Sequence, residues 1–431
     1  MTLALNLAVP AVAGARLDVP LVGTDLTVPY ANLDHAASAP CLEAVQDAVN
    51  ELIPWYASVH RGAGFASQVS TRVYEQARDV LRRFVGAHRS DTVIFTRNTT
   101  DALNLLARAV PAGTSVVLFD TEHHAALLPW RGPHVFRLPT PPNPGDAVLA
   151  LEDALRSCPA GPRLVVVTGA SNVTGEVWPV ARLAEVARRH GARIALDAAQ
   201  LAPHRPVDIQ ALDVDYVALS GHKLYAPFGA GALIGRADWL RAAPPYLIGG
   251  GATRAVTSRG VSWSDGPERH EGGSPNVVGV HALAVACSTL ARHWDAIITH
   301  ERDLLARLRS GLASVPGLRS LSLFGPDHDR VGVVSFTVDG RNAGLLAAVL
   351  SAEHGVGVRD GLFCAHIATR RLLGSGDRAL RASLGLGSTA EHVDRLIAGL
   401  HDEPRWDYAL VDGRWAPSAD SRPLPPFIAN A

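Results

Sequence analysis

Short apolar runs alternate with helix-like segments between about residues 90 and 235. The runs are TVIFT (92–96), SVVLFD (115–120), RLVVVTG (163–169), ARIALDA (192–198), VDYVALS (214–220) and GALIG (231–235). Nearly continuous Val, Ile and Leu character is typical of strands that are buried on both faces of a parallel sheet. Helical patterns lie between the runs, such as PVARLAEVARRHG, which Gly191 closes. The alternation predicts an α/β domain with a mostly parallel sheet.

The pattern changes after about residue 285. One long helical stretch over 281–315 precedes the apolar run VGVVSFTV, a helix that ends near Gly355, a strand in ALRASLGLG and a helix in EHVDRLIAGL. This predicts a smaller α+β unit. The Pro-rich end is either an ordered wrap anchored by Trp406 and Trp415 or a loose tail. We therefore expect an N-terminal extension (1–29), a large domain (30–285), a small C-terminal domain packed with part of the N-terminal segment (286–401) and a tail (402–431).

Composition excludes several classes of partner. The net charge is −1 and no block of like charges occurs, so neither nucleic acid nor an anionic membrane is an expected partner. No apolar run approaches the roughly 20 residues of a membrane span. The four cysteines are far apart and form no CxxC pair, which favours free thiols. The N-terminus lacks a basic segment and contains Pro10, so we expect no signal peptide and a cytoplasmic protein.

Polar residues gather where the predicted strands end, which is where ligands bind in open α/β sheets. They are Asp197 and Gln200 after one strand, Ser220, His222 and Lys223 after the next, His123 after VVLFD, and Asn172 after VVVTG. Thr99 and Thr100 open a helix, whose free backbone N–H groups favour a phosphate.

Lys223 is the only lysine among the 40 Lys and Arg residues of the chain. Pyridoxal phosphate (PLP) needs a lysine amine for its Schiff base, a carboxylate for its ring nitrogen and a phosphate cradle. Arginine cannot replace that lysine, because a guanidinium does not form the imine. A lone lysine could also survive by chance, and strand-end Asp and Ser residues often cap helices. We expect no metal, because neither His123 with His124 nor Cys364 with His366 has a third ligand at suitable spacing.

Longer motifs resemble a known family. TEHHAALLPW, SNVTGEVWPV, DAAQLAPHRPVD, LSGHKLYAPFGAGALIG and EGGSPNVVGV resemble the class V, fold-type I PLP enzymes, and among them the type II cysteine desulfurases and selenocysteine lyases. VHRG (59–62) and RASLGLGSTAEHVDRL (381–396) extend the resemblance to about residues 30–400. It implies the fold of a fold-type I PLP-dependent transferase, with a PLP-binding large domain and a smaller C-terminal α+β domain.

The resemblance also implies a role for each matching residue. Lys223 would form the Schiff base, Asp197 would pair with the ring nitrogen, and Gln200 would contact the ring oxygen with Asn172 beside it. His123 would stack on the ring and move protons. Thr100, Ser220 and His222 match phosphate contacts, and Arg381 matches the arginine that binds the substrate carboxylate. Ser274 matches a residue that reaches the partner subunit's phosphate, which implies a homodimer.

The segment VGVRDGLFCAH (356–366) bears on the reaction. Arg359, Gly361 and Cys364 fit the loop of type II desulfurases, which implies that Cys364 takes the sulfur of L-cysteine as a persulfide, releases alanine and could serve a sulfur-acceptor protein. Leu362, Phe363 and Phe228 depart from the common pattern and make the predicted pocket more apolar. A class V aminotransferase, epimerase or C–S lyase that acts on a bulkier amino acid therefore stays open, as does a non-enzymatic binding module.

Overall fold

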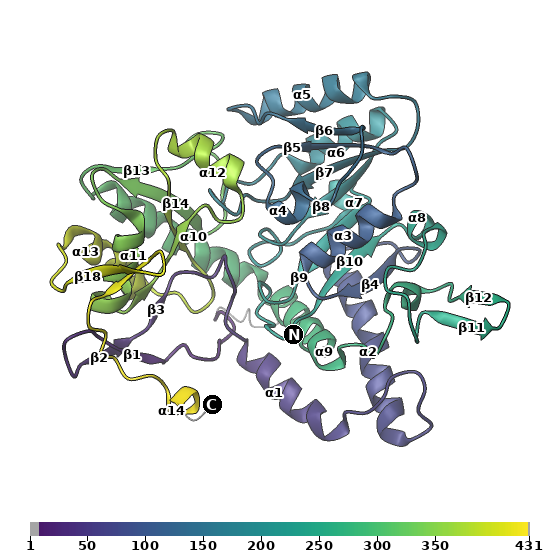
Figure 1. The fold of residues 1–431 in the computed structure, drawn as a ribbon, viewed down its shortest axis with the longest axis horizontal. Coiled ribbons are helices and arrows are strands. Elements are labelled where there is room, and N and C mark those ends of the chain that lie inside the picture. The colour runs from purple at the N-terminus through teal and green to yellow at the C-terminus, as the bar shows by residue number, and fades with distance from the viewer. Residues whose placement is uncertain (1–7, 430–431) are drawn as a thin grey trace, which may run out of the picture.

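The computed structural model describes residues 8–429 and contains a seven-stranded sheet, which lies in the right half of Figure 1. Across the sheet the strands are β4 (Thr92–Thr96), β10 (Gly231–Gly235), β9 (Tyr216–Ser220), β8 (Arg193–Asp197), β7 (Arg163–Thr168), β5 (Ser115–Phe119) and β6 (Val135–Leu138). The pairs from β9 through β6 are parallel, whereas β10 runs antiparallel to β4 and β9. The predicted α/β fold with a mostly parallel sheet is confirmed.

Two details of this sheet differ from the prediction. The apolar run of β10 looks like that of the parallel strands because β10 is also buried on both faces, although it runs the other way. Strand β6 was not predicted, because its sequence VFRL is short and only partly buried at the edge of the sheet.

Each strand contributes to two hydrophobic cores, one on each face of the sheet. Val117 and Phe119 of β5 belong to one core, while Val116 and Leu118 belong to the other. The first core is covered by α1 (Glu43–Leu52), α2 (Phe65–Phe84), α5 (Pro144–Ser157), α6 (Val180–Arg189), α7 (Ile209–Leu212) and α9 (Val277–Ala291). The second is covered by α3 (Thr99–Ala109), α4 (His124–Leu127) and α8 (Ala237–Ala242).

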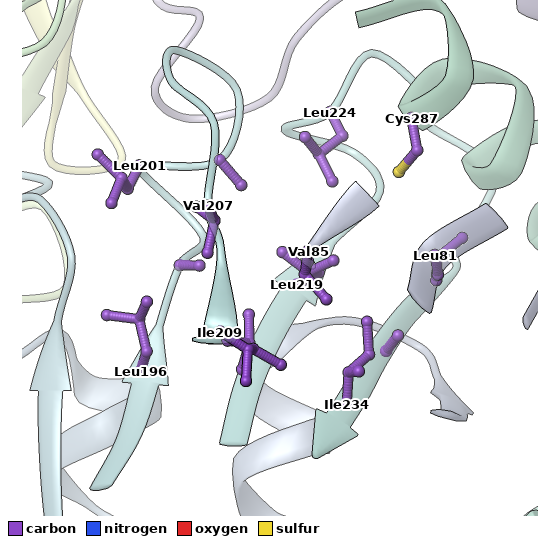
Figure 2. Packing of buried hydrophobic residues seen from close by; sticks show 14 of the residues in the cluster. Leu81, Val85, Leu196, Leu201, Val207, Ile209, Leu219, Leu224, Ile234 and Cys287 are labelled. Carbon is purple, nitrogen blue, oxygen red and sulfur yellow. The ribbon is translucent and has the colours of Figure 1, made fainter. Parts of the chain in front are cut away.

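The first core supports the strand ends that matter for function. Figure 2 shows Leu196 of β8, Leu219 of β9 and Leu224 of the following loop among its buried residues. Each of the three is a sequence neighbour of a predicted site residue, namely Asp197, Ser220 and Lys223. Close packing beneath these positions fixes the backbone that presents the polar side chains.

A four-stranded antiparallel sheet lies in the C-terminal part. Its strands, in order, are β13 (Leu318–Ser320), β14 (Val333–Val338), β17 (Ala379–Ser383) and β16 (Arg359–Gly361). The helices α10 (Trp294–Ala313), α11 (Ala343–His354), α12 (His366–Leu373) and α13 (Ala390–His401) accompany it. Strand β3 (Ala31–Asn32) pairs with β15 (Val356–Gly357), so the N-terminal segment packs here. The predicted domain boundaries stay predictions.

The long helical stretch predicted over 281–315 consists of two helices. Helix α9 ends at Ala291 and α10 begins at Trp294, and His293 between them has a non-helical φ of −127°. Its Nδ1 bonds the carbonyl oxygen of Thr289 at 2.7 Å. The break carries no proline or glycine, so the periodicity alone did not reveal it.

The C-terminal tail is ordered, which was one of the two predicted alternatives. Strands β18 (Tyr408–Val411) and β19 (Arg414–Pro417) form a hairpin, followed by α14 (Pro426–Ala429). Glu353 of α11 accepts hydrogen bonds from the backbone N–H of Arg405 and of Trp406 and from the Tyr408 hydroxyl. The tail therefore packs against α11 beside the N-terminal hairpin of β1 (Asp18–Pro20) and β2 (Thr27–Pro29), where Trp406 leaves no room for a side chain at Gly23.

Two further expectations can be compared with the described residues. Within residues 8–429, no helix combines the length and the apolarity that crossing a membrane requires. All four cysteines are free thiols, as predicted.

Candidate active site

A cavity of about 200 Å³ opens at the carboxyl ends of the parallel strands. Twelve of the thirteen predicted site residues line it: Thr99, Thr100, His123, Asn172, Asp197, Gln200, Ser220, His222, Lys223, Arg359, Cys364 and Arg381. They come from the large sheet, from the small sheet and from loops between them. The cavity therefore brings together residues that are far apart in the sequence.

Lys223 reaches the cavity from a tight turn that follows β9. The Lys223 N–H donates to the Ser220 carbonyl (3.2 Å), and Gly221 is required because a Cβ there would lie 2.5 Å from the carbonyl oxygen of Ala230. The Lys223 amine donates to Gln200 Oε1 at 3.5 Å. Burial lowers the pKa of the amine to about 8, although the Asp197 carboxylate opposes that shift. A substantial fraction of the amine is thus neutral, and nucleophilic, near physiological pH.

Asp197 ends β8 and is 3% exposed. The Ala199 N–H donates to its Oδ1 at 3.0 Å. Burial raises the pKa of this carboxyl, while the Ala199 N–H and the Lys223 amine lower it. A cationic N–H placed in the cavity would complete the set of partners that keeps Asp197 ionised.

His123 is the N-cap of α4. The Ala125 N–H donates to His123 Nδ1 (3.0 Å), so the proton of the neutral ring is on Nε2. Burial and the nearby Lys223 amine lower the pKa of His123 to about 3. The ring is therefore neutral and has a fixed tautomer, which suits stacking on an aromatic ligand.

The N-terminus of α3 supplies an anion cradle. Asn98 caps this eleven-residue helix, and the Thr99 N–H donates to Ser220 Oγ at 3.2 Å. The Thr99 hydroxyl is buried and lacks a hydrogen-bond partner within the described chain. The positive end of the helix dipole and this hydroxyl fit a phosphate group.

Two arginines face the opposite side of the cavity. Arg381, 2% exposed, donates to the Asn172 carbonyl (2.9 Å) and to Asp34 Oδ1 (3.2 Å), and its Nε–H lacks a partner among the described residues. Arg359 donates to Asp34 Oδ2 at 3.1 Å. Asp34 was not predicted from the sequence, since it lies 325 residues before Arg359 and its spacing carries no signal. Its carboxylate holds both guanidinium groups as a substrate carboxylate could.

Cys364 lies at the mouth of the cavity and is exposed. Both Phe363 and Cys364 have a φ of +52°, a left-handed conformation that costs energy for such residues. Two hydrogen bonds hold this backbone: Asn172 Nδ2 donates to the Phe363 carbonyl (2.6 Å) and the His124 N–H donates to the Cys364 carbonyl (2.8 Å). The Phe363 ring stacks over the Arg381 guanidinium, with 5.0 Å between Cζ and the ring centre.

Three apolar residues that depart from the desulfurase pattern were predicted to make the pocket more apolar, but only one of them lines the cavity. Phe363 lines the cavity, but Phe228 and Leu362 do not. Phe228 packs against the first core and Leu362 against a small cluster around Val173. The pocket is therefore made more apolar by one of the three residues.

Ser274 is the predicted site residue that lies elsewhere. It lines a separate surface hollow with Tyr56, His60 and Arg61. One chain alone thus does not bring Ser274 to Lys223. The predicted contact of Ser274 with a partner subunit's phosphate stays a prediction.

The donor set fits PLP and gives no indication of a metal. The amine of Lys223, the buried carboxylate of Asp197, the neutral ring of His123 and the cradle at α3 match the groups of that cofactor one by one. Within residues 8–429, no group of three or more His, Cys, Asp and Glu side chains could hold a metal ion.

Known proteins match this chain over most of its length. The aminotransferase class-V family model matches residues 31–396. A cysteine desulfurase of Dickeya dadantii is 38% identical over 401 residues, which cover 90% of this chain and 95% of the relative. Among solved structures, the apo cysteine desulfurase of Thermococcus onnurineus has a TM-score of 0.79 at 29% identity, covering 91% of this chain and 98% of its own. The Escherichia coli cysteine desulfurase CsdA has a TM-score of 0.74 at 32% identity, covering 86% and 94%.

The chain belongs to the aminotransferase class-V family, whose enzymes depend on PLP. The predicted resemblance to class V, fold-type I enzymes is confirmed.

Proposed function

We propose that the protein is a PLP-dependent cysteine desulfurase, which converts L-cysteine to L-alanine and leaves the sulfur on Cys364. The observation that carries the proposal is that the Cys364 thiol, the Lys223 amine and the Arg381 guanidinium line one cavity. The named relatives support the same reaction, since they are cysteine desulfurases of nearly equal length. Selenocysteine, which differs in one atom, would fit the same residues.

Each residue has a task in this reaction. PLP, when bound, withdraws electrons from the substrate Cα. Lys223 would hold the cofactor and move a proton at Cα, Asp197 would keep the ring nitrogen protonated, and the N-terminus of α3 would bind the phosphate. Arg381 binds the substrate carboxylate as a bidentate pair in place of Asp34 and the Asn172 carbonyl.

Cys364 takes part in the step that breaks the C–S bond. Its thiolate attacks the sulfur of the substrate, an S–S bond forms, the C–S bond breaks and its electron pair returns to the substrate carbon, which is protonated to give alanine. Cys364 is exposed and lines the cavity, so its thiol is accessible both to the substrate and to an external acceptor. The outer sulfur atom of an exposed persulfide can be transferred to an external thiol, so we propose a sulfur-acceptor protein as a partner. We also propose the cytoplasm as the compartment, because it keeps thiols reduced.

The experiment follows alanine and protein-bound sulfur. Purified protein with PLP receives L-cysteine, and mass spectrometry locates the added sulfur atom. We expect it on Cys364, and we expect Cys364→Ser to lose alanine formation by at least about 100-fold, as removal of a nucleophile does. Cys41→Ser is the matched control, because Cys41 does not line the cavity. Full alanine formation by Cys364→Ser would contradict the proposal.

One observation favours a second candidate function. Phe363 covers Arg381 with an aromatic ring, which suits a bulkier side chain than that of cysteine. A class V aminotransferase, epimerase or C–S lyase would then convert such an amino acid to a keto acid, an inverted product or a cleaved thiol. The test is to incubate the PLP-loaded protein with a panel of amino acids. Turnover of a bulkier amino acid with no reaction of cysteine would favour this alternative over the desulfurase.

We also propose a homodimer in which Ser274 completes the partner's phosphate site. Four large apolar side chains are exposed beside the hollow that contains Ser274: Ile53, Trp55, Tyr56 and Phe65. Exposed apolar residues that cluster in this way mark interfaces. A second copy of the chain is the occupant that would make use of Ser274.

A further inference from the structure

A buried chain of hydrogen bonds leads from Lys223 to helix α10. Lys223 Nζ donates to Gln200 Oε1 (3.5 Å), Gln200 Nε2 lies 3.2 Å from His204 Nε2, and His204 Nδ1 contacts Glu301 Oε2. Gln200 and His204 are buried, and Glu301 is nearly so. His204 and Glu301 do not line the cavity, and neither was predicted as a site residue.

The chemistry of the groups fixes the direction of each bond. A carboxylate only accepts, so the Glu301 side chain requires the proton of His204 to be on Nδ1. In the neutral ring, His204 Nε2 then has a lone pair and accepts, and the atom of Gln200 that lies 3.2 Å from it is the amide nitrogen. The amide is planar, and its oxygen is therefore left facing the Lys223 nitrogen.

Local packing leaves space for this arrangement. Gly332 lies against Glu301, and a Cβ at that position would be 3.0 Å from Glu301 Oε2. A second tie between the same two parts of the chain lies next to it, since Arg205 pairs with Asp329 through two hydrogen bonds of 2.5 and 2.8 Å. The Arg205–Asp329 pair therefore already joins these two parts of the chain. The hydrogen bonds of His204 differ from that pair because they lead to Gln200, which lines the cavity.

We propose that His204 and Glu301 are positioning residues that hold the Gln200 amide with its oxygen toward the Lys223 nitrogen, and so increase the proton affinity of that nitrogen when it carries the cofactor. The inference rests on one part of the proposed function, namely that Lys223 binds PLP. An amide oxygen beside the nitrogen stabilises its protonated form, whereas an amide N–H in the same place would disfavour it.

Other charged groups also face this chain of bonds. Lys223 is faced by Asp197 from β8, Arg359 from β16, Cys364 from the following loop and Arg381 from β17. The imidazole rings of His123 and His222 also face it. His35 faces His204, and Arg205 and Tyr225 face Glu301. The variants chosen below leave all of these groups in place.

The test is a pH titration of the visible absorption band of the PLP-loaded protein. Glu301→Gln replaces the carboxylate with a group that also donates, so His204 can hold its proton on Nε2 and the Gln200 amide can turn over. We expect the midpoint of the absorbance change to fall by about one pH unit, which corresponds to about 1.4 kcal/mol. His204→Phe keeps a ring of similar volume without its nitrogens and should lower the midpoint in the same direction.

A double-mutant cycle separates positioning from a general structural role. In a Gln200→Met background, Glu301→Gln should cause no further shift, because its effect passes through the Gln200 amide. Asp329→Asn, which removes the negative charge from the neighbouring pair with Arg205, should leave the midpoint unchanged. An unchanged midpoint in Glu301→Gln, an equal shift in the Gln200→Met background or an equal shift in Asp329→Asn would each overturn the inference. A wild-type protein without the band would contradict the proposed function, so the two failures are distinguishable.

Discussion

Lys223 combines two environments that oppose each other. The cavity takes the amine out of water, which favours the neutral form, while Asp197 favours the ammonium. The balance leaves the pKa at about 8, well below the 10.5 of a free lysine side chain. The residue can therefore react with an aldehyde at a pH where an exposed lysine would be almost fully protonated.

This balance predicts the pH dependence of cofactor attachment. A lowered pKa means that the neutral amine forms as the pH rises through about 8, so the rate of PLP attachment to the cofactor-free protein should rise up to that pH and then level off. Stopped-flow absorbance measures the rate. Asp197→Asn should move the midpoint lower, because the carboxylate that raises the pKa is gone. A rate that continues to rise beyond about pH 10 would contradict this account of Lys223.

The sequence predicts the site residues that follow strands. It does not predict the residues that contact those site residues from distant segments. Lys223, Asp197 and His123 follow apolar runs, so their common location follows from the rule for open α/β sheets. Asp34 and Glu301 carry no such signal, because the fold brings them to the site from segments far away in the sequence. Their positions could be known only after the two sheets had been placed together.

At the scale of elements, burial decided which parts could be predicted. Strands β5 and β7 are buried on both faces and were predicted nearly to the residue. Strand β6, partly exposed, was missed, and the break between α9 and α10 has no residue that would end a helix by itself. The tail hairpin was left open, since its attachment depends on one acceptor, Glu353, in a distant helix.

The tail supplies the prediction at this scale. Glu353→Ala removes the acceptor for two backbone N–H groups and a tyrosine hydroxyl, so the hairpin of β18 and β19 should detach more often. We expect cleavage by trypsin after Arg405 and Arg414 to become about tenfold faster, which corresponds to about 1.4 kcal/mol. Glu391→Ala, which breaks a pair with Arg395 between side chains on one helix, is the control and should change nothing. Equal rates in all three proteins would show that Glu353 does not hold the tail.

At the scale of the molecule, the site is divided between what one chain supplies and what it lacks. The cavity of one chain contains the amine, the carboxylate and the arginines, whereas Ser274 lies in another hollow. The exposed apolar side chains beside that hollow connect the two observations, since they would bury themselves against a second chain. The resemblance predicted that Ser274 serves the site of a partner subunit. The structure adds which surface around Ser274 is apolar.

Assembly is therefore expected to affect cofactor binding. Phe65→Glu places a charge in the exposed apolar cluster, so the protein should sediment as a monomer. It should also bind PLP about tenfold more weakly through loss of the Ser274 contact. Leu149→Glu is the matched control, because Leu149 is comparably exposed but lies on α5, away from α1 and α2 (Figure 1). A Phe65→Glu protein that stays dimeric would exclude this surface as the interface.

The most direct measurement uses the fact that the chain has one lysine. The protein is incubated with PLP, treated with borohydride to make the attachment permanent, digested and mapped by mass spectrometry. We predict one cofactor per chain on the peptide that contains Lys223, and none on the corresponding peptide of Lys223→Arg. A chain that gains no cofactor, or gains it at its terminal amine alone, would contradict the claim that Lys223 holds PLP at the ends of the parallel strands.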